Sequence, residues 1–180
     1  MTVLNSKRLI LRSIESKDIN QTYLNWLNDP NVNQFLETRF FPQSIESIQS
    51  YWHNHRDDKH SPWLAITLRD DKKHIGNIKI GPIQWVHRSA DISIFIGEQD
   101  CWGKGYATEA IALIRDWSFN ELDLQKLNSG IYSGNIGSRR AFEKCGFKLE
   151  GTLQDEVYCN GGRLDVWRMG LTRNDWRLFS

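Results

Sequence analysis

The stretch that decides the fold is Trp102-Gly103-Lys104-Gly105-Tyr106-Ala107-Thr108-Glu109-Ala110, a glycine-containing turn followed directly by a helical pattern. The apolar stripe of that helix consists of Ala107, Ala110, Ile111, Ile114 and Trp117. The first turn of a helix leaves backbone N–H groups unpaired and carries a partial positive charge. Because glycine has no Cβ, an anion such as a pyrophosphate can approach this backbone closely. Taken alone, Gly-x-Gly is more typical of an ordinary tight turn, and the stretch lacks the spacing of a dinucleotide-binding turn or a P-loop.

The residues at the start of the chain predict a strand and two helices. The strand is expected from Arg8 to Arg12, with Ser16 as an N-cap for the segment that follows. Apolar residues then recur at helical spacing until an Asn-Asp-Pro sequence stops the helix. A second helical pattern begins at Ser44.

Strand patterns occupy the middle of the chain, on both sides of the glycine turn. Trp63–Leu68 and His74–Ile80 are separated by a polar, turn-like sequence and predict a hairpin. A third strand runs from Ala90 to Ile96 and alternates between apolar and polar residues at its start. After the long helix, Lys126–Tyr132 predicts another short strand.

The end of the chain predicts a short helix from Ile136 to Lys144 and a closing hairpin. The hairpin strands run from Phe147 to Val157 and from Leu164 to Leu171, around the turn Asn160-Gly161-Gly162. The order is strand, two helices, three antiparallel strands, helix, strand, helix and two strands. It predicts an α+β fold with a mixed, mainly antiparallel central sheet flanked by helices, in a single domain of residues 1–180.

Composition and charge narrow the class of protein. Hydrophobic residues make up 39% of the 180 residues and aromatic residues 12%, which suits a folded globular protein. A formal net charge of +1 without a long basic run argues against a nucleic-acid-binding surface. The three scattered cysteines lack disulfide-framework or zinc spacing, so we expect reduced thiols and no metal. No apolar run approaches bilayer length and no secretory h-region is seen, so we expect a cytoplasmic protein that does not bind membranes.

Another motif begins at Asn135 and reads Asn-x-x-Ser-x-x-Ala-Phe-x-x-x-Gly-Phe, ending at Phe147. Together with Ala90-Asp91-Ile92 and the glycine turn, it resembles the GNAT acetyltransferase superfamily. The opening Lys7-Arg8-Leu9-Ile10-Leu11-Arg12 and the tail residues 151–166 resemble the branch that contains ribosomal-protein N-terminal acetyltransferases. The resemblance covers nearly the whole chain in order. It implies direct transfer of an acetyl group from acetyl-CoA to a primary amine in a ternary complex.

The resemblance also implies where acetyl-CoA binds. The pyrophosphate is expected on the backbone amides from Gly103 to Thr108. The pantetheine arm is expected in a V-shaped opening between the strand from Ala90 to Ile96 and Lys126–Tyr132. Asn135 resembles the family residue that hydrogen-bonds this arm or its supporting loop. The residues expected at the cofactor are Ile94, Ile96, Trp102, Gly103, Lys104, Gly105, Tyr106, Ala107, Thr108, Asn135, Ser138 and Phe142.

Two positions depart from the family pattern. Trp102 stands where the family often has Gln or Arg, and backbone amides are expected to compensate. Phe142 stands where many members have a tyrosine thought to protonate the departing thiolate. A thiol with a reference pKa of about 8.5 can leave without strong acid help. Ser138 is the alternative proton donor, or else a hydroxyl that satisfies local backbone. The alternative function, suggested by Phe142, is a catalytically silent acetyl-CoA-binding sensor or interaction module.

An attacking amine must lose a proton, and three side chains are candidates for the base. Asp91 occupies the acidic position of the family's Ala-Glu-Ile strand and is the first candidate. Glu37 is the second candidate, because it follows the helical segment expected beside the acceptor. His87, in the loop before the strand that contains Asp91, is the third. Each is also explained as an ordinary solvent-facing residue. A solvated helix end, and not a metal site, is expected for His53, His55 and His60.

The acceptor amine is expected between the first helices and the last hairpin, where the family places its pocket. The candidates for its lining are Trp26, Phe35, Glu37, Trp85 and Tyr158, although helix packing is the more ordinary explanation of Trp26. Residues 23–37 are similar to members that acetylate amino sugars of bacterial surface polysaccharides. The acceptor stays open among an amino sugar, free or nucleotide-linked, a protein N-terminus and a small antibiotic-like amine. The sequence is compatible with a monomer or a homodimer.

Overall fold

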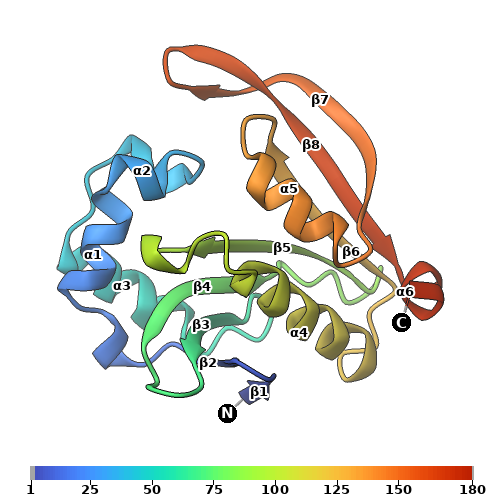
Figure 1. The fold of residues 1–180 in the computed structure, drawn as a ribbon, viewed down its shortest axis with the longest axis horizontal. Coiled ribbons are helices and arrows are strands. Elements are labelled where there is room, and N and C mark those ends of the chain that lie inside the picture. The colour runs from blue at the N-terminus through green and yellow to red at the C-terminus, as the bar shows by residue number, and fades with distance from the viewer. Residues whose placement is uncertain (1–2, 180) are drawn as a thin grey trace.

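The computed structural model describes residues 3–179, so Met1, Thr2 and Ser180 of the predicted domain lie outside the described residues. Within that range, eight strands form a sheet in the order β1-β2-β3-β4-β5-β6-β8-β7 (Figure 1). All neighbouring pairs are antiparallel except β5 and β6. The strands are β1 (Val3–Asn5), β2 (Leu9–Ser13), β3 (Trp63–Leu68), β4 (His74–Ile80), β5 (Ser89–Ile96), β6 (Lys126–Tyr132), β7 (Lys148–Cys159) and β8 (Gly162–Thr172).

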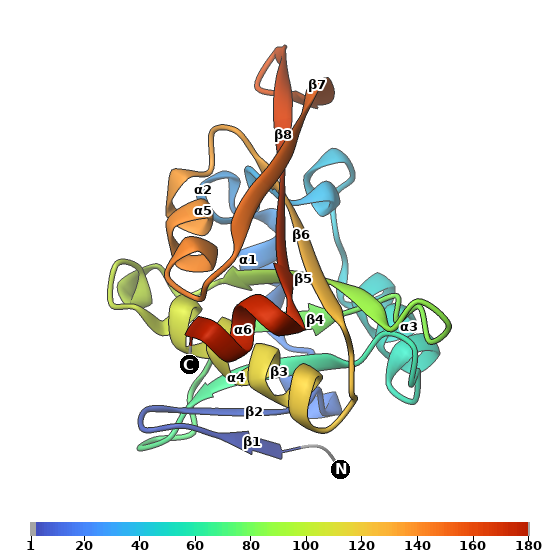
Figure 2. The same cartoon turned by 90° about the vertical axis from the view of Figure 1, so that its right-hand side faces the viewer.

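Helices cover both faces of the sheet (Figures 1 and 2). Successive residues of a strand face opposite sides, and β3 shows the consequence. Leu64 and Ile66 belong to a core that includes the apolar face of α4, whereas Ala65 between them belongs to a core with α1 and α3. This two-sided packing confirms the predicted α+β class. The helices are α1 (Gln21–Asn28), α2 (Pro30–Asn33), α3 (Ile45–His55), α4 (Tyr106–Asn120), α5 (Ile136–Glu143) and α6 (Arg173–Phe179), with short 3-10 turns η1 (Ser16–Asp18), η2 (Glu37–Phe40) and η3 (Gln99–Cys101).

The predicted opening between the two parallel strands is confirmed. β5 and β6 pair only at their first residues, with Asp91 opposite Asn128 as the last pair. Beyond this point β5 continues beside β4, whereas β6 continues beside β8. The sheet therefore splits into a V whose mouth lies at the carboxyl ends of both strands.

Local signals account for most element ends, with one error. The predicted N-cap role of Ser16 is wrong, because Ser16 is the first residue of η1 and α1 is capped by Asn20, whose side chain accepts from the Tyr23 N–H at 3.1 Å. Pro30 stops α1 as expected, but it also begins the short helix α2, because proline suits the first helical position. The predicted closing turn is present, with positive φ at Asn160 and Gly161.

Candidate active site

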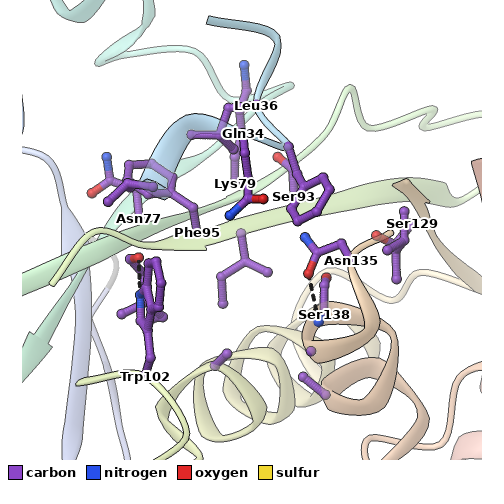
Figure 3. A pocket seen from close by; sticks show the side chains of 18 of the residues that line it. Gln34, Leu36, Asn77, Lys79, Ser93, Phe95, Trp102, Ser129, Asn135 and Ser138 are labelled. Carbon is purple, nitrogen blue, oxygen red and sulfur yellow. Dashed lines mark hydrogen bonds between the residues drawn. The ribbon is translucent and has the colours of Figure 1, made fainter. Parts of the chain in front are cut away.

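A cavity of about 1090 Å³ lies at the split between β5 and β6 (Figure 3). Because side chains alternate along β5, the cavity has two sides. The α4 side comprises Ile94 and Ile96 of β5 with residues 102, 103 and 105–108 and the start of α5. The β4 side comprises the opposite face of β4 and β5 with the segments that cover it, and its lining includes Gln34, Phe35, Glu37, Thr38, Tyr51, Trp63, Asn77, Lys79, Ser93, Phe95 and Tyr132.

The glycine turn presents open backbone to the α4 side. Gly103 and Gly105 have φ of +70° and +80°, a left-handed conformation that favours glycine, and Gly105 is the N-cap of α4. A Cβ added at Gly103 would meet no other atom within 4 Å, and one at Gly105 would meet only Arg8 Nη2, at 3.6 Å. The space above the turn is therefore free for an anion at the helix N-terminus, so these residues fit a pyrophosphate group.

A hydrogen-bonded network fixes this turn to the start of the chain. The Glu109 carboxylate accepts from Ser6 Oγ at 2.7 Å, from the Arg8 N–H at 2.9 Å and from Arg8 Nε at 2.6 Å. Arg8 also donates to the Lys104 carbonyl at 2.9 Å and lies 4.6 Å from the centre of the Tyr106 ring. Burial alone would raise the pKa of Glu109, but the hydrogen bonds from Ser6 and Arg8 lower it. The carboxylate therefore stays ionised and holds the glycine turn in place.

The strand and side chains next to the turn complete the α4 side. The Trp102 indole donates to the Ile96 carbonyl at 2.8 Å and lines the cavity, so it ties the turn to the end of β5. Lys104 is predicted at the cofactor but its side chain is not part of the lining. The contribution of Lys104 that the structure shows is its carbonyl, which receives Arg8.

The start of α5 also lines the cavity on the α4 side. Asn135 is the N-cap of α5, and its Oδ1 accepts from the Ser138 N–H at 3.1 Å. Ser138 lines the cavity beside it, as Figure 3 shows. Phe142 is 1% exposed and packs edge-on against Phe147, with 5.0 Å between ring centres. The structure therefore brings together the predicted residues of the motif that begins at Asn135.

Glu37 is the predicted carboxylate that lines the cavity. The Tyr132 hydroxyl at the end of β6 donates to Glu37 Oε1. Arg39 holds the same segment from the other direction, because it donates to the Leu36 carbonyl and to the Tyr158 carbonyl, each at 2.6 Å. These contacts fix η2 of the N-terminal half against β6 and the β7–β8 hairpin.

Asp91, the first candidate for the base, lies elsewhere. Its Oδ1 is 3.0 Å from Arg168 Nη2 of β8, and its half-exposed side chain is not part of the cavity lining. Asp91 is the last residue of β5 that pairs with β6, so it lies where the V begins and not in its mouth. His87 is likewise outside the lining.

Of the predicted acceptor residues, Phe35 and Glu37 line the cavity. Trp26 of α1 is 6% exposed, its side chain lies in the core, and its indole donates to Glu98. These contacts support the explanation that Trp26 packs the helix. Trp85 is a surface residue bonded to His60, and Tyr158 extends from β7 outside the lining. Among residues 3–179, no group of three or more His, Cys, Asp or Glu side chains could hold a metal ion.

Sequence reasoning missed the floor of the β4 side. Asn77 and Lys79 of β4 pair with Phe95 and Ser93 of β5, so the four side chains share one face of the sheet. Figure 3 shows them along one wall of the cavity. Polar residues at alternate positions of an otherwise apolar strand are a signal for such a floor, because they face away from the apolar core.

Comparison with known proteins identifies the family. Residues 8–148 match the family described as "Acetyltransferase (GNAT) domain", and the chain therefore belongs to the GNAT acetyltransferases. Its chemistry is the transfer of an acetyl group from acetyl-CoA to an amine, as the sequence predicted. The expected cofactor, acetyl-CoA, is therefore confirmed.

Particular relatives cover almost the whole chain. The chain is 29% identical over 175 residues to spermidine N(1)-acetyltransferase of Vibrio cholerae, across 95% of this chain and 96% of that protein. It is 30% identical over 166 residues to the N-acetyltransferase YoaA of Bacillus subtilis, across 91% and 93%. The crystal structure of Vibrio cholerae spermidine N-acetyltransferase in complex with CoA and spermine has a TM-score of 0.86 at 27% identity, across 96% and 99% of the two chains.

The comparisons also correct one expectation. The GNAT resemblance is confirmed, but these relatives are not specifically ribosomal-protein acetyltransferases. A small-molecule amine is therefore the better-supported kind of acceptor. None of the helices in residues 3–179 is long and apolar enough to cross a membrane.

Proposed function

We propose that this chain acetylates the amine of an oxygen-rich small molecule, of which an amino sugar is the closest chemical description. The observation that carries the proposal is the kind of polar side chain on the β4 side. Most of these polar side chains are neutral amides and hydroxyls, and Glu37 is the one carboxylate in the cavity lining among the described residues. Amides and hydroxyls recognise sugar hydroxyls, because each can donate and accept hydrogen bonds.

In the proposed reaction the acceptor enters from the β4 side and its amine contacts Glu37. Acetyl-CoA supplies the acetyl thioester from the α4 side. The Glu37 carboxylate accepts the proton that the amine loses as the N–C bond forms and the C–S bond breaks. Ser138, at the start of α5 on the α4 side, is the proposed donor toward the departing sulfur, and solvent returns the proton to its hydroxyl. Tyr132 and Arg39 orient the Glu37 segment through the contacts described above.

A polyamine is the second candidate, and the name of the Vibrio cholerae relative and the spermine in its crystal structure favour it. A protonated polyamine presents several cations and N–H donors along its length. The β4 side offers it one carboxylate, together with the cation of Lys79. Charge complementarity therefore ranks the polyamine below an amino sugar for this chain.

The test is thiol release from acetyl-CoA with a panel of amino sugars, nucleotide-linked amino sugars, spermidine, spermine and N-terminal peptides. The proposal expects release that depends on an amino sugar, with a higher kcat/KM than for spermidine. A higher kcat/KM for spermidine would replace the first candidate by the second. No release with any amine, although acetyl-CoA binds, would favour the sensor function instead.

A further inference from the structure

Lys79 is a cation on the cavity floor that pairs with no carboxylate of residues 3–179. It lies on β4 and lines the β4 side (Figure 3). Its Nζ donates to the Tyr51 hydroxyl at 3.0 Å, and no ion pair within the described part of the chain includes it. An ammonium group carries three N–H donors. Lys79 therefore keeps N–H donors for a molecule in the cavity.

The position of this ammonium group is fixed by its neighbours. The Tyr51 ring stacks on His55, with 3.9 Å between ring centres, and meets the Trp63 ring edge-on at 5.2 Å. These contacts hold the phenol oxygen in place, and the phenol oxygen holds Lys79 Nζ. Ser93, the β5 partner of Lys79 in the sheet, adds an exposed hydroxyl to the same floor.

The β4 side carries a negative charge at one place and a positive charge at another. The carboxylate of Glu37 comes from the segment that covers the cavity, and the ammonium group of Lys79 comes from its floor. The other cations of the lining are Arg140 of α5 and Lys144, the C-cap of α5, both on the α4 side. An acceptor that matches this arrangement carries an amine at one position and an anion at another.

We propose that Lys79, with the hydroxyls of Tyr51 and Ser93, binds an anionic oxygen group of the acceptor, either a phosphate or a carboxylate. The inference rests on the proposed function, because it places the acceptor amine at Glu37. This binding site narrows the class of acceptor from oxygen-rich amines to amines that also carry an acidic group. An amino sugar that bears a phosphate or a uronic carboxylate is an example. A molecule with only cationic groups meets repulsion from Lys79 at this place.

The experiment measures binding of four probes to the complex of the protein with CoA. The probes are glucosamine, glucosamine 6-phosphate, an aminouronic acid and spermidine, so that the phosphate and carboxylate sources are compared directly. Wild-type protein is expected to bind an acidic probe at least about tenfold tighter than glucosamine, as a hydrogen-bonded charge pair implies. Lys79→Gln is expected to abolish that difference, and Lys79→Glu to reverse it and improve spermidine binding.

Two controls separate this subsite from general effects. Lys59→Glu makes the same charge change at an exposed lysine outside the cavity, and it is expected to leave the binding of all four probes unchanged. Tyr51→Phe keeps the charge but removes the hydroxyl that orients Lys79, so it is expected to weaken only the acidic probes. The affinity for acetyl-CoA is expected to stay at the wild-type value in every variant, which shows that each is folded.

Equal affinity of wild-type protein for the acidic and neutral probes would overturn the inference, and so would an acid preference that survives in Lys79→Gln. Both results come from binding and not from turnover. They are therefore independent of the thiol-release assay, whose failure would count against the proposed acetyl transfer itself.

Discussion

Replacing Gly105 by alanine should weaken acetyl-CoA binding more than a matched substitution elsewhere. Gly105 has φ of +80° at the start of α4, and Gly161 has φ of +83° in the β7–β8 turn. Neither position has a neighbour that an added Cβ would clash with. The backbone strain of alanine is therefore similar at both, about 1–2 kcal/mol. For a chain of this size, each variant should melt about 2–8 °C below wild type without ligand.

The two variants should differ once acetyl-CoA is present. A Cβ at Gly105 occupies the space through which a pyrophosphate approaches the backbone N–H groups, and each lost hydrogen bond to a charged group costs about 1.5–3 kcal/mol. The Kd of Gly105→Ala for acetyl-CoA should therefore rise at least about tenfold. At 100 times the wild-type Kd, acetyl-CoA should stabilise wild type and Gly161→Ala by about 2.7 kcal/mol, but Gly105→Ala by about 1.4 kcal/mol or less.

Calorimetric titration and thermal unfolding with and without acetyl-CoA measure both effects. A wild-type Kd in Gly105→Ala would refute the assignment of the glycine turn to the pyrophosphate. An equal loss of affinity in Gly161→Ala would show instead that the effect comes from general destabilisation.

Three further predictions concern catalysis and pH. Glu37→Gln should lower kcat by a factor of about 10²–10⁴, whereas Asp91→Asn should change kcat less than about tenfold, because Asp91 lies outside the cavity lining. Steady-state assays measure both values, and a larger loss of kcat in Asp91→Asn would restore Asp91 as the base. In the same assays, full turnover in Ser138→Ala would remove Ser138 as a proton donor. Burial alone would raise the pKa of Asp18, but hydrogen bonds from Arg12, at 2.6 and 2.8 Å, help to bring it below its ordinary value of 3.8. The stability from this pair is therefore present above about pH 4 and lost as the pH falls through the lowered pKa. Asp18→Asn should cost about 3–5 kcal/mol at pH 7 and less at pH 2; urea unfolding at both values measures this, and an equal cost at both would contradict it.

The α4 side could be predicted from sequence because its determinants are adjacent in the chain. The open space over Gly103 and Gly105 follows from residue type and from the start of a helix, both of which are local. The same holds for Asn135 as the N-cap of α5. The network from Arg8 to Glu109 was not predicted, because it joins residues that only the fold brings together.

The β4 side was predicted poorly because strand register and packing decide it. Trp26, Trp85 and Tyr158 were chosen by residue type, and their side chains lie in the core or outside the cavity. Lys79 reaches the cavity because β4 pairs with β5 in the register that places it opposite Ser93. A shift of one residue would have turned it to the other face of the sheet.

This difference between the two sides bears on how the relatives are used. The residues expected at the cofactor are a few adjacent residues and the start of one helix, so relatives at 27–30% identity can share them together with the fold. The lining of the β4 side includes residues of η2, α3, β4 and β5, and single side chains on these elements can change without disturbing the sheet. One substitution at a position such as Lys79 changes the charge of the floor while β4 keeps its pairing with β3 and β5. Family membership therefore establishes acetyl transfer, whereas the acceptor has to be read from the side chains of the β4 side.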